Sequence, residues 1–142
     1  MKVLSLFLFL MLTLICSHNL SAQAIQTQTP DTSRQNIYLV HFPKGKQRVN
    51  VGAYMLGLAH PVTFIVKVKH GKTLNASIRE LSDKGNIRIN QIIMPDGSSD
   101  GPFSKTVKYP IQHKGTYKII AGGSNMQGDD WKGAFNMRIS IQ

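Results

Sequence analysis

Residues 115–142 read GTYKIIAGGSNMQGDDWKGAFNMRISIQ. Two segments with alternating apolar and polar residues, 116–121 and 134–141, flank a polar, glycine-rich loop that holds the only tryptophan, Trp131. Alternation with a period of two is typical of a strand with one buried face. We expect the two segments to form the closing hairpin of an antiparallel β-sandwich, and the loop to be the first candidate for a binding site.

The same period of two runs through the chain from Ile37 onward. It is clearest in residues 61–70, where alternate side chains should point inward: Val62, Phe64, Val66 and Val68. Further strands are predicted at 37–42, 47–55, 87–93 and 103–109, together with one through Leu74, Ala76 and Ile78. In the strand at 87–93 the inward residues should be Ile87, Ile89, Gln91 and Ile93. The pattern predicts one all-β domain, residues 37–142, an antiparallel β-sandwich of jelly-roll or Greek-key type with about seven or eight strands.

The N-terminal segment has the pattern of a secretory signal peptide. Lys2 precedes an apolar run over residues 3–15, and Ala22-Gln23-Ala24 offers the small residues of a cleavage site. We therefore predict a signal peptide at 1–24 and a flexible lead-in at 25–36, which is rich in Gln, Thr, Ser and Pro. The bulky Leu14-Ile15 pair before Cys16 does not fit a lipoprotein signal. Cys16 is the only cysteine, so the mature protein should have no disulfide, as expected of a bacterial periplasmic or secreted protein.

The chain is strongly basic. It carries 17 Lys and Arg against 7 Asp and Glu, a net charge of +10 that becomes +9 when Lys2 is removed. This charge favours anionic partners, such as an anionic glycan of the cell envelope. Several basic side chains have the outward parity of their strands and would form one basic face if those strands were neighbours: Lys67, Lys69, Arg88, Lys118 and Arg138. The alternative is that lysines keep the protein soluble and protect sheet edges. Because no exposed aromatic residues are interleaved with them, the pattern does not favour a nucleic-acid partner.

The glycine-rich loop is the main candidate for a binding site. It brings together two apolar anchors and three hydrogen-bonding side chains: Asn125, Met126, Asp129, Asp130 and Trp131. Such a set suits a protein interface or a sugar site. In the alternative, Trp131 and Met126 cap the open end of the sandwich while the polar residues make turns.

No catalytic motif occurs in the chain. Glu80 is the only glutamate, and no histidine of the mature chain has an Asp or Ser at a recognised catalytic spacing. We therefore expect a non-enzymatic protein without a cofactor. Residues 96–101, DGSSDG, match the first half of a calcium loop, but Val107 stands where the bidentate carboxylate belongs. An Asx-rich turn is the preferred interpretation, and no metal site is predicted.

Tyr117 opens a core strand directly after a polar turn. In Greek-key sandwiches a tyrosine at this place often donates its hydroxyl to an upstream backbone group, an arrangement called a tyrosine corner. The alternative is an ordinary aromatic core residue. Both interpretations agree with a sandwich.

Four segments resemble the bacterial pre-peptidase C-terminal type of domain, a β-sandwich of secreted bacterial proteins. They are residues 40–45, 62–71 leading into Leu74, 114–119 and 125–141. Their order and spacing are similar to those of the stand-alone periplasmic members, which include the inhibitors of g-type lysozymes. The resemblance implies the sandwich fold, and because its motifs are structural glycines and core positions it implies little about function.

Three functional hypotheses follow, of which the third is a purely structural or accessory domain. In the first, the protein is a secreted or periplasmic, non-enzymatic binding protein whose partner is a protein or an anionic glycan of the cell envelope. In the second, drawn from the resemblance, it is a lysozyme inhibitor that blocks an active-site cleft with its loops. Lysozymes are usually cationic, so a domain of this charge would meet one with unfavourable long-range electrostatics, and inhibition would have to work through a local acidic loop such as Asp129-Asp130.

Overall fold

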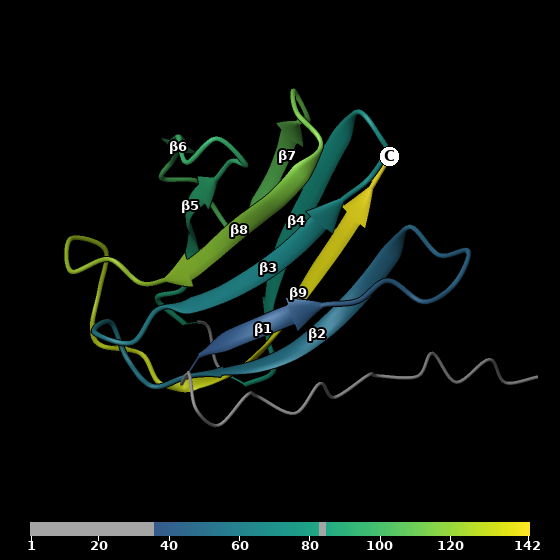
Figure 1. Cartoon of the computed structure of the whole chain (residues 1–142). Coiled ribbons are helices and arrows are strands. Elements are labelled where there is room, and N and C mark those ends of the chain that lie inside the picture. Colours follow the sequence, from purple (N-terminus) through teal and green to yellow (C-terminus); the bar gives the residue numbers. More distant parts are fainter. Residues whose placement is uncertain (1–35, 83–84) are drawn as a thin grey trace, which may run out of the picture.

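The structure is a computed structural model that describes residues 36–82 and 85–142 (Figure 1). Its strands are β1 (Ile37–Val40), β2 (Arg48–Met55), β3 (Val62–Val68), β4 (Thr73–Glu80), β5 (Arg88–Ile93), β6 (Ser99–Asp100), β7 (Thr106–Pro110), β8 (Gly115–Gly122) and β9 (Gly133–Ile141). The predicted signal peptide, nearly all of the lead-in and Cys16 lie outside the described residues. Within the described ranges, no helix is long and apolar enough to cross a membrane.

The strands form two sheets that face each other. Sheet A has the order β1-β3-β8-β5-β6, and sheet B has the order β2-β9-β4-β7. The strand pairs are antiparallel except for β1 and β3, which run parallel. The predicted all-β sandwich is therefore confirmed, with a parallel edge strand and the short β6 as additions.

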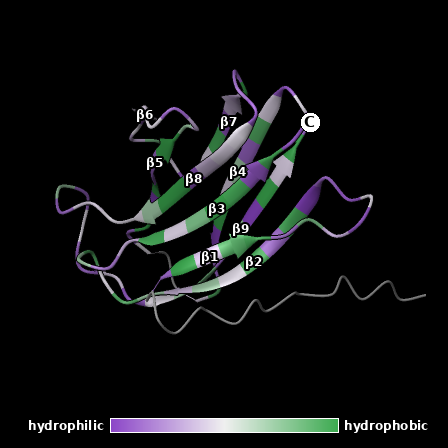
Figure 2. Cartoon of the chain, viewed as in Figure 1, coloured by the Kyte–Doolittle hydropathy of each residue, from purple (hydrophilic) through white to green (hydrophobic). Residues whose placement is uncertain are grey.

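The core lies between the inner faces of the two sheets. The residues predicted to point inward from β3 and β4 are buried: Val62, Phe64, Val66, Val68, Leu74, Ala76 and Ile78. Phe64 connects the layers, because its ring stacks on Tyr38 of β1 at 5.3 Å and meets Phe135 of β9 edge-on at 6.1 Å. Figure 2 shows the alternation as green and purple bands, for example along β9.

The C-terminal strands do not form the predicted hairpin. β8 pairs with β3 and β5 in sheet A, whereas β9 pairs with β2 and β4 in sheet B. Alternation shows that each strand has one buried face, but it does not show which sheet the strand joins. The segment between them is long enough to cross the roughly 10 Å that separates two packed sheets. The glycine-rich loop is therefore a bridge between the layers.

The inward residues of β5 also differ from the prediction. The pairing of β5 with β8 shifts between Ile89 and Gln91, where a bulge leaves Asn90 without a partner. One extra residue in a strand reverses the side on which every later side chain lies. As a result Ile92 is buried, whereas Gln91 and Ile93 are half-buried on the outer face.

Tyr117 makes the hydrogen bond expected of a tyrosine corner. Its hydroxyl donates to the backbone carbonyl of His113 at 2.8 Å, while its ring is 1% exposed and belongs to the core. Tyr117 is therefore both a tyrosine corner and an aromatic core residue. The hydrogen bond fastens the turn before β8 to the strand that it precedes.

Replacing Tyr117 by Phe should remove this bond and keep the ring. We expect the free energy of unfolding to fall by about 1 kcal/mol, the usual net value of one such hydrogen bond. Urea denaturation measures it, with Tyr54→Phe as the control because Tyr54 is 49% exposed on β2. Equal losses in the two variants would show that the corner does not stabilise the fold.

Candidate functional site

The β8–β9 loop (residues 123–132) projects from one end of the sandwich, where it leaves sheet A and enters sheet B (Figure 1). The segment between β1 and β2 lies at the opposite end. Most of the β8–β9 loop is exposed, and Met126 is 95% exposed. The loop is therefore accessible to a partner from solution.

The side chain of Asn86 holds the β8–β9 loop in one conformation. Its Nδ2 donates to the carbonyls of Ser124 at 2.9 Å, Gly128 at 3.0 Å and Asp129 at 3.0 Å. Its Oδ1 accepts from the N–H of Ser124 at 3.2 Å. Asn86 follows β4 in the chain, so one amide fixes both ends of a loop that is distant in sequence. These bonds take the place of a hairpin ladder, which this loop lacks.

Asp130 joins the β8–β9 loop to the turn after β2. Its Oδ1 accepts a hydrogen bond from the N–H of Leu58 at 2.6 Å. Gly57 allows this approach, because a Cβ at its φ of +121° would lie 2.7 Å from Asp130 Oδ1. The carboxylate of Asp130 thus links the loop to the rest of the domain, although the residue is exposed.

Trp131 packs into the end of the sandwich. Its half-buried indole lies against the core and covers Gly85 on one side and Gly133 on another. A Cβ at either glycine would overlap the ring. The capping interpretation therefore describes Trp131. Of the five predicted loop residues, Asn125, Met126 and Asp129 remain exposed with no side-chain hydrogen bond among the described residues.

Glu80, at the end of β4, holds in place Gly85, which the indole of Trp131 covers. Its Oε1 accepts from the N–H of Gly85 at 3.0 Å and forms a salt bridge with Lys105 Nζ. Partial burial by itself would raise the pKa of the Glu80 carboxyl, but the hydrogen bonds and the charge of Lys105 together hold the pKa below its ordinary value of 4.5. Glu80 thus ties Gly85, and with it the surface that Trp131 covers, to β4 and to the segment before β7.

The five predicted basic residues do not share one face. β3, β8 and β5 are neighbours in sheet A, so Lys67 and Lys118 lie on its outer side, whereas Arg138 belongs to β9 in sheet B. Arg88 is engaged elsewhere, since its guanidinium donates to Asn90 Oδ1 at 3.0 Å and to Gln127 Oε1 at 3.1 Å. The alternation along a strand shows which side chains point outward, but it does not show which sheet the strand belongs to. The prediction therefore grouped residues from the outer faces of two different sheets.

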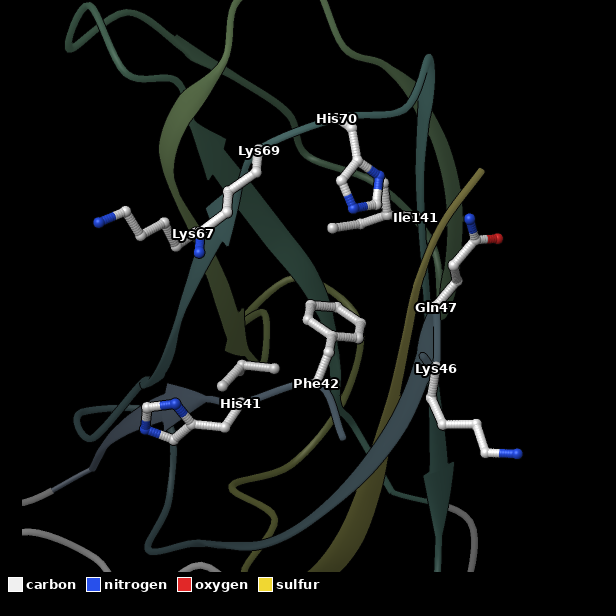
Figure 3. Close-up of a pocket in the computed structure, with 9 residues that line it drawn as sticks. His41, Phe42, Lys46, Gln47, Lys67, Lys69, His70 and Ile141 are labelled. Atoms are coloured by element: carbon white, nitrogen blue, oxygen red, sulfur yellow. The ribbon is translucent and has the colours of Figure 1, made fainter. Parts of the chain in front are cut away.

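A basic pocket of about 290 Å³ lies at the other end of the sandwich, where β3 extends beyond the last paired residue of β1 (Figure 3). It is lined by Val40, His41, Phe42, Lys46, Gln47, Lys67, Lys69, His70 and Ile141. Phe42 lies in its middle, while Lys67 and Lys46 point away to opposite sides. Of these residues only Lys67 and Lys69 were singled out from the sequence. The pocket holds no carboxylate that could work with a histidine as an acid–base pair.

Residues 96–101, which match the first half of a calcium loop, begin with an Asx turn between β5 and β6 and continue through β6. Asp96 Oδ1 accepts from the N–H of Ser98 at 3.0 Å, and Asp100 Oδ1 accepts from the N–H of Gly101 at 2.8 Å. Hydrogen bonds from the Ser98 hydroxyl and N–H hold the pKa of Asp96 below its ordinary value. Within residues 36–82 and 85–142, no group of three or more His, Cys, Asp or Glu side chains could hold a metal ion.

Comparisons with known proteins relate the chain to a solved structure. No family model and no curated protein matches it, so no family finding supports the resemblance to pre-peptidase C-terminal domains. A crystal structure of PliG from Aeromonas hydrophila, a periplasmic lysozyme inhibitor of g-type lysozyme, matches with a TM-score of 0.60 and 16% identity. The match covers 75% of this chain and 96% of that chain. At this identity the likeness shows a shared fold.

Replacing Asn86 by Asp should loosen the β8–β9 loop, because a carboxylate cannot donate to the three carbonyls that the amide now serves. We expect a loss of about 1–3 kcal/mol in the free energy of unfolding and faster proteolysis within residues 123–132. Asn125→Asp is the matched control, since it makes the same change in the same loop without a bond to lose. If both variants resist protease equally, Asn86 does not hold the loop.

The salt bridge of Glu80 should make stability depend on acid pH. Because the pKa of Glu80 is lowered in the folded state, its stabilisation is present above pH 4.5 and is lost as the pH falls through the folded pKa. Glu80→Gln should therefore cost about 1 kcal/mol at pH 7 and less near pH 3. Urea midpoints of both proteins across this range test it, and a constant difference would contradict the assignment.

Proposed function

We propose that this protein is a secreted or periplasmic, non-enzymatic inhibitor that binds a lysozyme and blocks its active-site cleft with the β8–β9 loop. The observation that carries the proposal is a pre-organised, projecting loop with an exposed apolar tip, Met126, on a fold that a g-type lysozyme inhibitor shares over 96% of its chain. The predicted signal peptide supports the location. The absence of a catalytic motif in the sequence supports a binding role.

A loop suits inhibition when it is ordered before it binds. An inhibitor whose loop is ordered only on binding loses affinity to the entropy of ordering. Here Asn86, Asp130 and Trp131 already fix the loop against the rest of the domain. Asn125 and Met126 can then enter a cleft with little further loss of freedom. Met126 would supply apolar contact that adapts to the shape of the cleft.

Electrostatics favour contact through this end of the molecule. The chain as a whole carries a net charge of +10, but Asp129 and Asp130 are consecutive acidic residues on the exposed loop. A cationic lysozyme would be repelled by the net charge of the domain and attracted by these two carboxylates of the loop. The charge distribution would thus orient the complex so that the loop faces the enzyme.

A protein partner is therefore the favoured part of the first functional hypothesis. An anionic glycan remains a prediction from the net charge, and the β8–β9 loop offers it little, because its carboxylates would repel such a ligand. A glycan would need a separate surface without acidic side chains.

A turbidity assay tests the proposal directly. We expect the purified secreted protein, at micromolar concentration, to slow the clearing of a bacterial cell-wall suspension by a g-type lysozyme. Assays with c-type and i-type lysozymes measure selectivity. Failure to slow any of the three enzymes would rule the proposal out.

The role of Met126 in inhibition can be separated from a general loss of apolar surface. Met126→Ala should raise the concentration needed for half inhibition about tenfold, the effect of removing a central apolar anchor. Leu39→Ala is the control, since Leu39 is 54% exposed on β1 and outside the loop. If the two variants inhibit equally well, inhibition does not depend on the tip of the loop.

A further inference from the structure

The outer face of sheet B carries two adjacent rows of polar side chains that cross all four strands. The cross-strand registers place the first row as Arg48, Ser140, Asn75 and Lys108, and the second row as Asn50, Arg138, Ser77 and Thr106. Each row takes one residue from β2, β9, β4 and β7, in the order in which the strands lie in the sheet. These eight side chains form the polar face of sheet B.

The polar face of sheet B is hollowed into a groove of about 410 Å³. Seven of the eight side chains line it, and Gln142 lines it as well. Small side chains, Ser140 and Ser77, lie on the two inner strands, while Arg48 and Lys108 stand on the edge strands β2 and β7. Strands lie about 4.8 Å apart, so the groove spans about 14 Å from β2 to β7. It is long enough to hold several linked sugar rings.

The charge of the groove is positive throughout. Arg48, Lys108 and Arg138 line it, and none of the acidic residues that the structure describes does. Arg138 Nε donates to Asn50 Oδ1 at 3.0 Å, which orients the guanidinium along the sheet. Its terminal amino groups have no partner among the described residues. Edge protection does not explain Arg138, because β9 lies between β2 and β4.

Asn75 adds a polar group without a partner. Its Nδ2 is buried and makes no hydrogen bond within the described part of the chain. A buried donor left unpaired costs about 1–3 kcal/mol. Asn75 lines the groove between Ser140 and Lys108. A ligand oxygen in the groove could accept from this amide once the side chain turns outward, and binding would then recover part of that cost.

We propose that the polar face of sheet B binds an acidic oligosaccharide that carries carboxylates and lies across the strands. The planar forks of Arg48 and Arg138 suit carboxylates, and the amides and hydroxyls between them suit sugar hydroxyls, which both donate and accept. No aromatic side chain lines the groove for stacking on nucleic-acid bases. It also lacks the large apolar or aromatic anchors that dominate protein interfaces. The chemistry therefore favours a charged saccharide.

Binding of tetragalacturonate to the full secreted protein tests the proposal, with calorimetry for affinity and NMR shifts for location. We expect binding that perturbs residues of the polar face of sheet B, while the neutral maltotetraose does not bind. Affinity should fall as the ionic strength rises from about 0.01 M to about 0.15 M, because the Debye length shortens from about 30 Å to about 8 Å. Absence of binding, or shifts confined to other surfaces, would overturn the proposal.

Variants separate the groove from the general positive charge of the protein. Arg138→Gln should weaken tetragalacturonate binding about tenfold or more, the value of a good charge-assisted contact. Arg79→Gln is the matched control, since Arg79 lies on the same sheet, opposite Asn136 and outside the groove. It should change the affinity by about twofold or less. Equal effects of the two substitutions would refute a specific site.

A tetraglutamate peptide provides the last comparison, because it carries carboxylates without sugar hydroxyls. We expect it to bind about tenfold more weakly than tetragalacturonate, since the amide and hydroxyl contacts are missing. Equal affinity would show that the face only exchanges anions and would refute saccharide recognition. These measurements do not involve a lysozyme, so their outcome is independent of the inhibitor proposal.

Discussion

The burial of one face of each sheet against the other is the constraint on which the rest of the molecule depends. Phe64 stands at the centre of this contact, stacked on Tyr38 in its own sheet and set edge-on to Phe135 in the other. Burying an aromatic side chain of this size contributes about 1.5–3 kcal/mol, and the core contains many apolar residues that add to it. Because the inner faces are committed to the core, every partner must be met by a loop at the ends of the sandwich or by an outer face.

Packing of the two layers also explains how the β8–β9 loop is built. Its flanking strands belong to different sheets, so the backbone between them has no ladder of its own. The loop is held instead by the side chain of Asn86, which follows β4, and by its own Asp130, whose carboxylate accepts from the N–H of Leu58 in the turn after β2. The same contacts hold the tip of the loop, which carries Met126, in one conformation before a partner binds.

The two proposed surfaces differ in charge and in place, so they need not compete. The β8–β9 loop carries the consecutive acidic residues Asp129 and Asp130 at one end of the sandwich, whereas the groove on sheet B is lined by three cations and no described acidic residue. One surface suits a cationic protein and the other suits an anionic saccharide. A protein that holds an acidic glycan on sheet B while its loop faces an enzyme that acts on glycans would keep the inhibitor near the place where that enzyme works.

The sequence by itself determined the strands, their buried faces and the loop worth testing, because alternation, turn residues and the lone Trp131 are local signals. It also indicated Tyr117 as a corner residue, since that hydrogen bond spans only four positions to His113. Only the tertiary structure decided which sheet each strand joins. Arg138 therefore lies in sheet B and Lys67 in sheet A, and the segment predicted as a hairpin loop connects the two sheets. The bulge at Asn90 reverses which side chains in the later part of β5 point inward. The tertiary structure also placed Arg48, Ser140, Asn75 and Lys108 in one row. Period-two patterns report which side of a strand is buried, whereas strand order is set by contacts between residues distant in the chain, and no local pattern records them.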